Sequence, residues 1–195
     1  MVLRTPDERR AQVEDTLRTV PRPYGRTARV IFWLEDRVWG SERSLPKFKA
    51  QELVARSPYR AWQRDHDDVA ADVREEANEK SHWSVVRQMI REDGARDGRI
   101  RFGLVPTLGA VGMFTFTLVQ HHFSPKASHW LNADIEDHAE HEYASFVAEH
   151  PEWEARAFVS AVAEYGLYES RNDVLRQISC DERAHKERSL LLAGD

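Results

Sequence analysis

Glu79-Lys80-Ser81-His82 is a four-residue pattern that returns near the other end of the chain as Glu182-Arg183-Ala184-His185. Side chains three positions apart lie one turn apart on the same helix face, so each pattern points a carboxylate and an imidazole the same way. With the 19 Glu and nine His of this chain, chance alone gives about one such pattern. An isolated Glu–His pair is most often a solvated surface pair. Two patterns therefore need further support from their surroundings.

That support comes from a lone glutamate on the expected helix before each pattern, Glu52 before the first and Glu136 before the second. A di-metal site in a four-helix bundle takes one Glu from each of two helices and a Glu-x-x-His pair from each of the other two. Oxygen donors with one imidazole per metal favour iron or manganese over structural zinc. We expect two iron ions. The predicted ligands are Glu52, Glu79, His82, Glu136, Glu182 and His185.

The fold class predicted from this order is all-α: a ferritin-like four-helix bundle with a di-iron carboxylate site and flanking short helices. Capping residues and breakers predict helices at about residues 6–20, 28–39, 67–91, 126–150, 154–165 and 172–192, and one opening at Ser44. Pro58 falls inside that last pattern and is expected to kink it. We expect residues 1–27 to form an N-terminal arm or helix and residues 28–195 the bundle domain.

Composition excludes several classes of protein. The chain has 195 residues, a formal net charge of −5 and a single cysteine, Cys180. Its charges are interspersed without a basic stripe, so we expect no nucleic-acid partner. One cysteine cannot form an internal disulfide, and the N-terminus lacks the apolar run of a secretory signal. The expectation is a cytoplasmic protein.

Residues 102–125 contain no Lys, Arg, Asp or Glu. This stretch exceeds the length that a bilayer crossing needs. A single crossing would nevertheless leave Glu52 and Glu79 on one side of the membrane and Glu182 on the other, so the ligands could not meet. We therefore expect a buried or interfacial helix here rather than a spanning one.

Two further side chains share the helix face of Glu136. His129 lies seven positions before it and Tyr143 seven positions after it, which is two helical turns in each direction. Tyr143 is a candidate donor of a proton or an electron to oxygen at the metal pair, and the alternative is a hydrogen-bonded core tyrosine. His129 is expected to hold the orientation of a ligand rather than to be one.

At these residues the chain resembles the alternative oxidase family, which includes mitochondrial alternative oxidases and plastid terminal oxidases. The similarity runs from about Leu45 to Lys186. It rests on specific motifs, which are Gln51-Glu52-Leu53-Val54-Ala55-Arg56-Ser57-Pro58-Tyr59, Asn78-Glu79-Lys80-Ser81-His82, Ser124-Pro125, His129, Ile135-Glu136-Asp137-His138-Ala139, Tyr143 and Asp181-Glu182-Arg183-Ala184-His185.

The resemblance implies oxidation of a quinol with four-electron reduction of dioxygen to water. It implies that Tyr143 is essential, that Asn78 and Asp181 support the ligands, and that apolar helix faces hold the protein in one leaflet, here the inner face of the cell membrane. Three features depart from the family: Gln51 and Lys47 stand where its quinone pocket usually has Leu and Arg, and residues 60–68 are charged where it is usually apolar.

Two other functions remain open from the sequence. One is a soluble di-iron oxidase or oxygenase acting on a small molecule other than a quinone, and the other is a non-catalytic, ferritin-like iron-binding bundle. Tyr143 argues against the second, because iron storage does not need it. The expected partners are a quinol or another small reductant, dioxygen and a membrane surface, with a homodimer left open.

Overall fold

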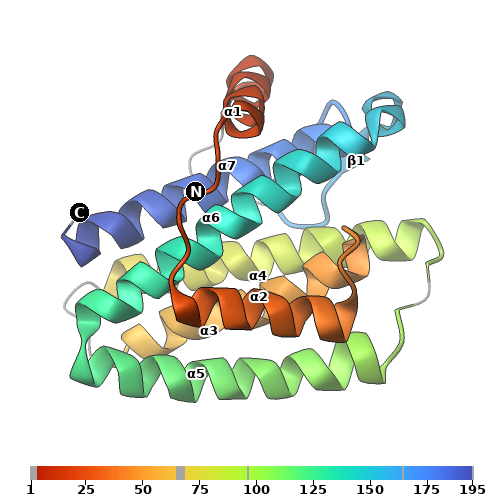
Figure 1. The fold of residues 1–195 in the computed structure, drawn as a ribbon. Helices are drawn as coiled ribbons and strands as arrows, with labels where there is room; N and C mark the ends of the chain where they lie inside the picture. Colours follow the sequence, from red (N-terminus) through yellow and green to blue (C-terminus); the bar gives the residue numbers. More distant parts are fainter. Residues whose placement is uncertain (1–3, 65–68, 96, 164, 195) are drawn as a thin grey trace.

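The structure, a computed structural model, describes residues 4–64, 69–95, 97–163 and 165–194. Four long helices form the bundle: α3 (Leu45–Trp62), α4 (Val69–Glu92), α6 (Pro125–Glu149) and α7 (Arg171–Ala193). They pack as two pairs, α3 with α4 and α6 with α7, and Figure 1 shows one pair lying over the other. The predicted all-α bundle is therefore confirmed.

Three further helices cover the bundle from two sides. α1 (Pro6–Arg18) packs on α6 and α7, whereas α5 (Val105–Phe123) packs along α3 and reaches α6. A π-helical turn, Ile100–Leu104, leads into α5. α2 (Arg26–Trp39) contacts α6 and that turn, and in Figure 1 it lies on the same side of the bundle as α5, while α1 lies on the opposite side.

Local sequence sets most helix boundaries. Thr5 and Glu8 form a reciprocal capping box at the start of α1, which satisfies backbone donors that the first turn leaves without partners. The side chains of Ser44 and Ser170 each accept a hydrogen bond from one backbone N–H in the first turn of α3 and of α7. Gly40 ends α2 with a φ of 95°, a conformation that glycine adopts without steric cost.

The predicted helix at residues 154–165 is wrong. A short 3₁₀ helix (Pro151–Ala155) is followed by an antiparallel pair, β1 (Phe158–Val159) and β2 (Leu167–Tyr168). Phe158 and Tyr168 are buried opposite each other, while Val159 and Leu167 face outward, because neighbouring side chains of a strand point to opposite faces. These two aromatic side chains close the end of the apolar core.

Buried apolar side chains gather toward that end of the bundle, beside the predicted ligands. The cluster draws on all four bundle helices and on both strands, and it includes Phe48, Met89, Phe146, Phe158, Val174 and Ile178. Such packing supplies the main favourable term in folding, so the polar site is built next to an apolar core.

α1 is joined to α7 by a buried ion pair. Arg9 donates from Nε to Oδ1 of Asp173 over 2.8 Å and from a terminal nitrogen to Oδ2 over 2.5 Å. The Arg9 and Asp173 side chains are 8% and 0% exposed. A two-pronged contact of this kind fixes both distance and orientation.

We expect Arg9→Ala to lower the free energy of unfolding by about 3–5 kcal/mol, because it leaves the Asp173 carboxylate buried without its cation. Urea denaturation measures the change. Arg10→Ala is the matched control: Arg10 pairs with Asp7 and Glu169 at the surface, and such pairs contribute about 0–1 kcal/mol. An equally small loss of unfolding free energy in both variants would show that α1 is an arm that contributes little to the fold.

Candidate metal centre

The six predicted ligands converge from the four bundle helices into one buried space. They form two groups whose donor atoms lie within 4.8 Å of one another in each group. The first group adds Glu52 and His82, and the second adds Glu136 and His185, to the two carboxylates common to both, Glu79 and Glu182. Each group suits one metal ion, so Glu79 and Glu182 are placed to bridge two ions.

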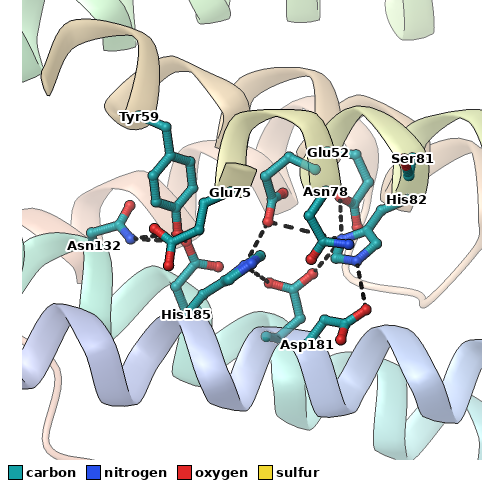
Figure 2. Close-up of polar contacts among 12 residues, drawn as sticks. Glu52, Tyr59, Glu75, Asn78, Ser81, His82, Asn132, Asp181 and His185 are labelled. Atoms are coloured by element: carbon teal, nitrogen blue, oxygen red, sulfur yellow. Dashed lines mark hydrogen bonds and ion pairs between the residues drawn. The ribbon is translucent and has the colours of Figure 1, made fainter. Parts of the chain in front are cut away.

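The two imidazoles cross over between the patterns. Nδ1 of His82 lies 3.0 Å from Glu182 Oε1, and Nδ1 of His185 lies 2.8 Å from Glu79 Oε1. Within each pattern the imidazole is farther from its own glutamate, at 3.8 Å in both cases. Figure 2 shows His82 and His185 at the two ends of the site. Each pattern therefore contributes to both metal positions instead of enclosing one.

Buried atoms without hydrogen-bond partners show that the site fits a cation pair. Within the described part of the chain, they include Glu52 Oε2, both oxygens of Glu79, Glu136 Oε2, Glu182 Oε1 and Nδ1 of both histidines. Leaving so many polar atoms buried without partners is costly. Four carboxylates also balance the charge of two divalent cations. The donor set thus matches the di-metal carboxylate sites of helical bundles.

Burial and mutual repulsion dominate the electrostatics of these carboxylates. Burial raises the pKa of Glu79 well above its usual value, and the charge of Glu182 raises it further. Burial and Glu182 likewise raise the pKa of Glu136. Burial lowers the pKa of His82, but the charge of Glu52, the hydrogen bond to Asp181 and the charge of Glu182 outweigh it and raise the pKa above its usual value. A bound cation reverses this balance by favouring the charged carboxylates.

One hydrogen-bond chain holds the far side of His82. Asp181 Oδ2 lies 3.4 Å from Nε2 of His82 and accepts from the Tyr165 hydroxyl over 2.8 Å. Gln177 donates to the other oxygen of Asp181, and the amide of Asn78 donates to Tyr165. The chain directs Nδ1 of His82 toward the carboxylates (Figure 2), as partners behind a metal ligand do.

Tyrosine hydroxyls anchor the two carboxylates that belong to one group each. Tyr143 donates to Glu52 Oε1, and Tyr59 donates to Glu136 Oε1 over 2.7 Å. Asn132 adds a second donor to the same Glu136 oxygen at 2.9 Å. In both glutamates the other oxygen has no hydrogen-bond partner among the described residues. Each terminal carboxylate is thus held by one oxygen and keeps the other for a metal.

Sequence reasoning missed Tyr59, Asn132 and Tyr165. Tyr59 lies seven positions after Glu52, and Asn132 lies four positions before Glu136, so the spacing argument that selected Tyr143 would have found both. Tyr165 had no such signal, because it lies in the segment wrongly predicted as a helix.

His129 lies outside the two metal groups. It is buried, and its ring packs 4.4 Å from that of Trp62 and 5.2 Å from that of His121. Its expected role in orienting a ligand stays a prediction.

A comparison with protein families matches residues 46–194 to the family described as alternative oxidase. The chain belongs to the alternative oxidase family. This match confirms the resemblance noted in the motifs, and it covers all four bundle helices apart from the first residue of α3. A search of curated proteins finds no match.

As an alternative oxidase, the protein is an oxidoreductase built on a di-iron helical bundle. The buried Glu and His groups of the chain are able to bind metal.

We expect Glu79→Gln or Glu182→Gln to abolish binding of both metals, because each removes a carboxylate common to the two groups. Glu52→Gln or Glu136→Gln should lose about one of the two metal ions, because each removes a ligand from one group only. Metal per chain is measured by mass spectrometry after anaerobic loading with ferrous ion. Glu76→Gln, one turn before Glu79 and paired with Arg56, is the control that keeps both. Equal metal content in all variants would contradict the shared-ligand arrangement.

Proposed function

We propose that the protein oxidises a quinol and transfers its electrons through a pair of iron ions to dioxygen, which is reduced to water. Glu79 and Glu182, which belong to both metal groups, would be shared by the two ions, Glu52 and His82 would complete one site, and Glu136 and His185 would complete the other. The iron pair supplies one-electron redox chemistry and reactivity with dioxygen. A single observation carries the quinol as substrate: an apolar groove leads from the surface to the ligands.

The groove lies between α2 and α5. It has a volume of about 410 Å³ and apolar walls formed by Leu34, Val38, Trp39, Val105, Met113 and Phe116. A second cavity, of about 40 Å³, is lined by four of the carboxylates, Glu52, Glu79, Glu136 and Glu182, and by Tyr143. The two spaces share the lining residues Ile31, Glu35, Val54 and Met113, so they adjoin.

The sizes of the inner cavity and the groove support different occupants for each. The inner cavity has room for about two or three waters, which suits dioxygen and the water formed from it but excludes an aromatic ring. The groove is large enough for a small ligand, and its apolar walls suit a quinol with a hydrocarbon tail better than a polar metabolite.

The two helices that form the groove, α2 and α5, also carry exposed apolar side chains. On α2, Val30, Trp33 and Leu34 are exposed, with Trp33 at 60%. On α5, Leu108, Val111 and Phe123 are exposed, with Phe123 at 81%. Large exposed apolar patches on soluble proteins are uncommon, and a helix pair with this face suits the plane of a membrane interface. We propose that this face docks on the inner surface of the cell membrane, where quinols are dissolved.

A spanning arrangement fits the same helix less well. Residues Ile100–Phe123 are long and apolar enough to cross a membrane by length and composition, with a mean hydropathy of 1.7 and 11% of the tested window buried. In Figure 1, however, α5 runs alongside α3 and the rest of the bundle. A crossing by α5 would carry the charged bundle helices into the hydrocarbon core with it.

The test of this function is oxygen uptake by the iron-loaded protein supplied with a short-chain quinol. Each quinol gives two electrons and dioxygen takes four, so uptake should consume two quinols per dioxygen without accumulating hydrogen peroxide. Uptake with ferrous ion but none with quinol would favour an iron-binding bundle. Uptake with a polar reductant only would favour a soluble oxidase acting on another small molecule.

Tyr143 is placed to donate a proton or an electron to oxygen in the inner cavity. Burial and the charge of Glu52 raise its pKa above the usual value, so the hydroxyl stays protonated. We expect Tyr143→Phe to keep its iron while quinol turnover falls at least about tenfold, or roughly 1.4 kcal/mol on the barrier.

Tyr59→Phe is the matched control for Tyr143→Phe. Its hydroxyl also donates to a ligand carboxylate, but Tyr59 is not among the residues that line the inner cavity. Its variant should lose much less turnover. Full turnover in Tyr143→Phe would leave that residue as core packing, and equal losses in both would point to ligand anchoring alone.

We expect Trp33→Glu combined with Leu108→Glu to abolish co-sedimentation with lipid vesicles, because both place charges on the proposed docking face. Iron content and the melting temperature should stay unchanged, since both side chains are exposed. Val159→Glu, on the outward side of β1 and 65% exposed, is the control that keeps vesicle binding. Vesicle binding by the double variant equal to that of the natural sequence would exclude this face.

A further inference from the structure

Glu35 occupies the junction between the outer groove and the inner cavity. It lies on α2 and lines both spaces. Its Oε2 accepts a hydrogen bond from Nε2 of Gln51 over 3.0 Å. Gln51 is the residue before Glu52, so this hydrogen bond connects the groove wall to the backbone segment that carries a metal ligand. Among the apolar side chains of the groove, Glu35 provides a carboxylate that can accept a hydrogen bond from a hydroxyl group.

The charged groups around Glu35 are largely occupied by one another. Lys47, on α3, lies 2.8 Å from Asp36 and 3.9 Å from Glu142 of α6. Arg43 also pairs with Glu142. His138 of α6 lines the inner cavity, while α5 contributes the uncharged Met113.

The acid–base behaviour of Glu35 follows from these surroundings. Burial raises its pKa to about 7, against the hydrogen bond from Gln51 and the charge of Lys47, which lower it. The charges of Asp36 and Glu142 raise it further. A group with this pKa exchanges protons readily near neutral pH, which is the property of an efficient general base.

We propose that Glu35 accepts a hydrogen bond, and then the proton, from the hydroxyl of the reducing substrate in the groove. This inference rests on the proposed function and adds a residue to it. Oxidation of one quinol breaks two O–H bonds. It releases two electrons, which a bound iron pair would accept, and two protons, of which one passes to Glu35 and from there to solvent and the other enters the inner cavity. Reduction of one dioxygen to two waters consumes four protons, so for every two quinols the two protons that leave through Glu35 are replaced by two taken up from solvent.

Gln51 sets the proton affinity of this carboxylate. The alternative oxidase family usually has Leu at the position of Gln51. The hydrogen bond between Glu35 and Gln51 is therefore specific to this chain and is not a feature of the family. The amide donates to the charged carboxylate and thereby favours it. Removing the amide as Gln51→Leu therefore raises the pKa of Glu35 and increases the pH at which the carboxylate becomes a base.

The experiment measures kcat/KM for a short-chain quinol on both sides of pH 7. In the natural sequence it should rise with pH as Glu35 loses its proton. Glu35→Gln should lower kcat/KM at least about tenfold and abolish this rise, and Glu35→Asp should restore part of both. Gln51→Leu should move the midpoint to higher pH. Glu149→Gln is the control, because it removes an exposed carboxylate that pairs with Arg43, and it should keep the pH profile of the natural sequence.

Two measurements distinguish a failure of this inference from a failure of the proposed function on which it rests. Iron content and oxygen uptake with ferrous ion alone should be the same in Glu35→Gln and the natural sequence, because Glu35 belongs to neither metal group. Infrared difference spectra should show a carboxylic acid band that disappears near pH 7 and is absent in Glu35→Gln. Quinol oxidation with an unchanged pH profile in Glu35→Gln overturns the inference alone, and no quinol oxidation in the natural sequence overturns both.

Discussion

Repulsion among four buried carboxylates is the constraint on which the rest of this structure depends. Glu52, Glu79, Glu136 and Glu182 are each at most 3% exposed, and their donor atoms lie within a few ångströms of one another. Water cannot screen charges held this way, so burial and mutual repulsion raise the pKa values of Glu79, Glu136 and Glu182, and cations between the carboxylates would favour their charged forms. A bound metal pair would therefore stabilise the folded state, and without it the bundle has to hold the carboxylates together against their mutual repulsion.

The bundle meets this constraint by fixing one side of each ligand and leaving the other side open. Tyr143 and Tyr59 each hold one oxygen of a terminal carboxylate, and Asp181 holds the far nitrogen of His82. Both oxygens of Glu79, in contrast, have no hydrogen-bond partner within the described residues. A terminal ligand needs one free oxygen and a bridging ligand needs two, so the pattern of anchoring agrees with the division of roles that the distances suggest.

The sequence predicted the bundle and the six side chains that the structure brings together, because both depend on helical periodicity, which local spacing records. Glu79 and His82 share a face whatever surrounds them. The sharing of Glu79 and Glu182 between two metal positions could not be predicted, since it depends on how four helices pack. The strand pair at Phe158 and Tyr168 was missed for a related reason: two-residue strands are too short to show a period, and burial against the core decides their conformation.

The two sides of the bundle are held by different kinds of contact, and this difference bears on the proposed route of the substrate. On the side of α1, Arg183 bonds to Glu140, which is fully buried, and Lys186 bonds to the same carboxylate. Separating these groups would leave a buried charge without a partner. On the side of α2 and α5, the contacts around Met113 and Val54 are apolar, and two glycines of α5 line the groove. Apolar contacts separate at little cost when an apolar ligand replaces them. The side that faces the proposed membrane is therefore also the side through which an apolar reductant can reach the ligands.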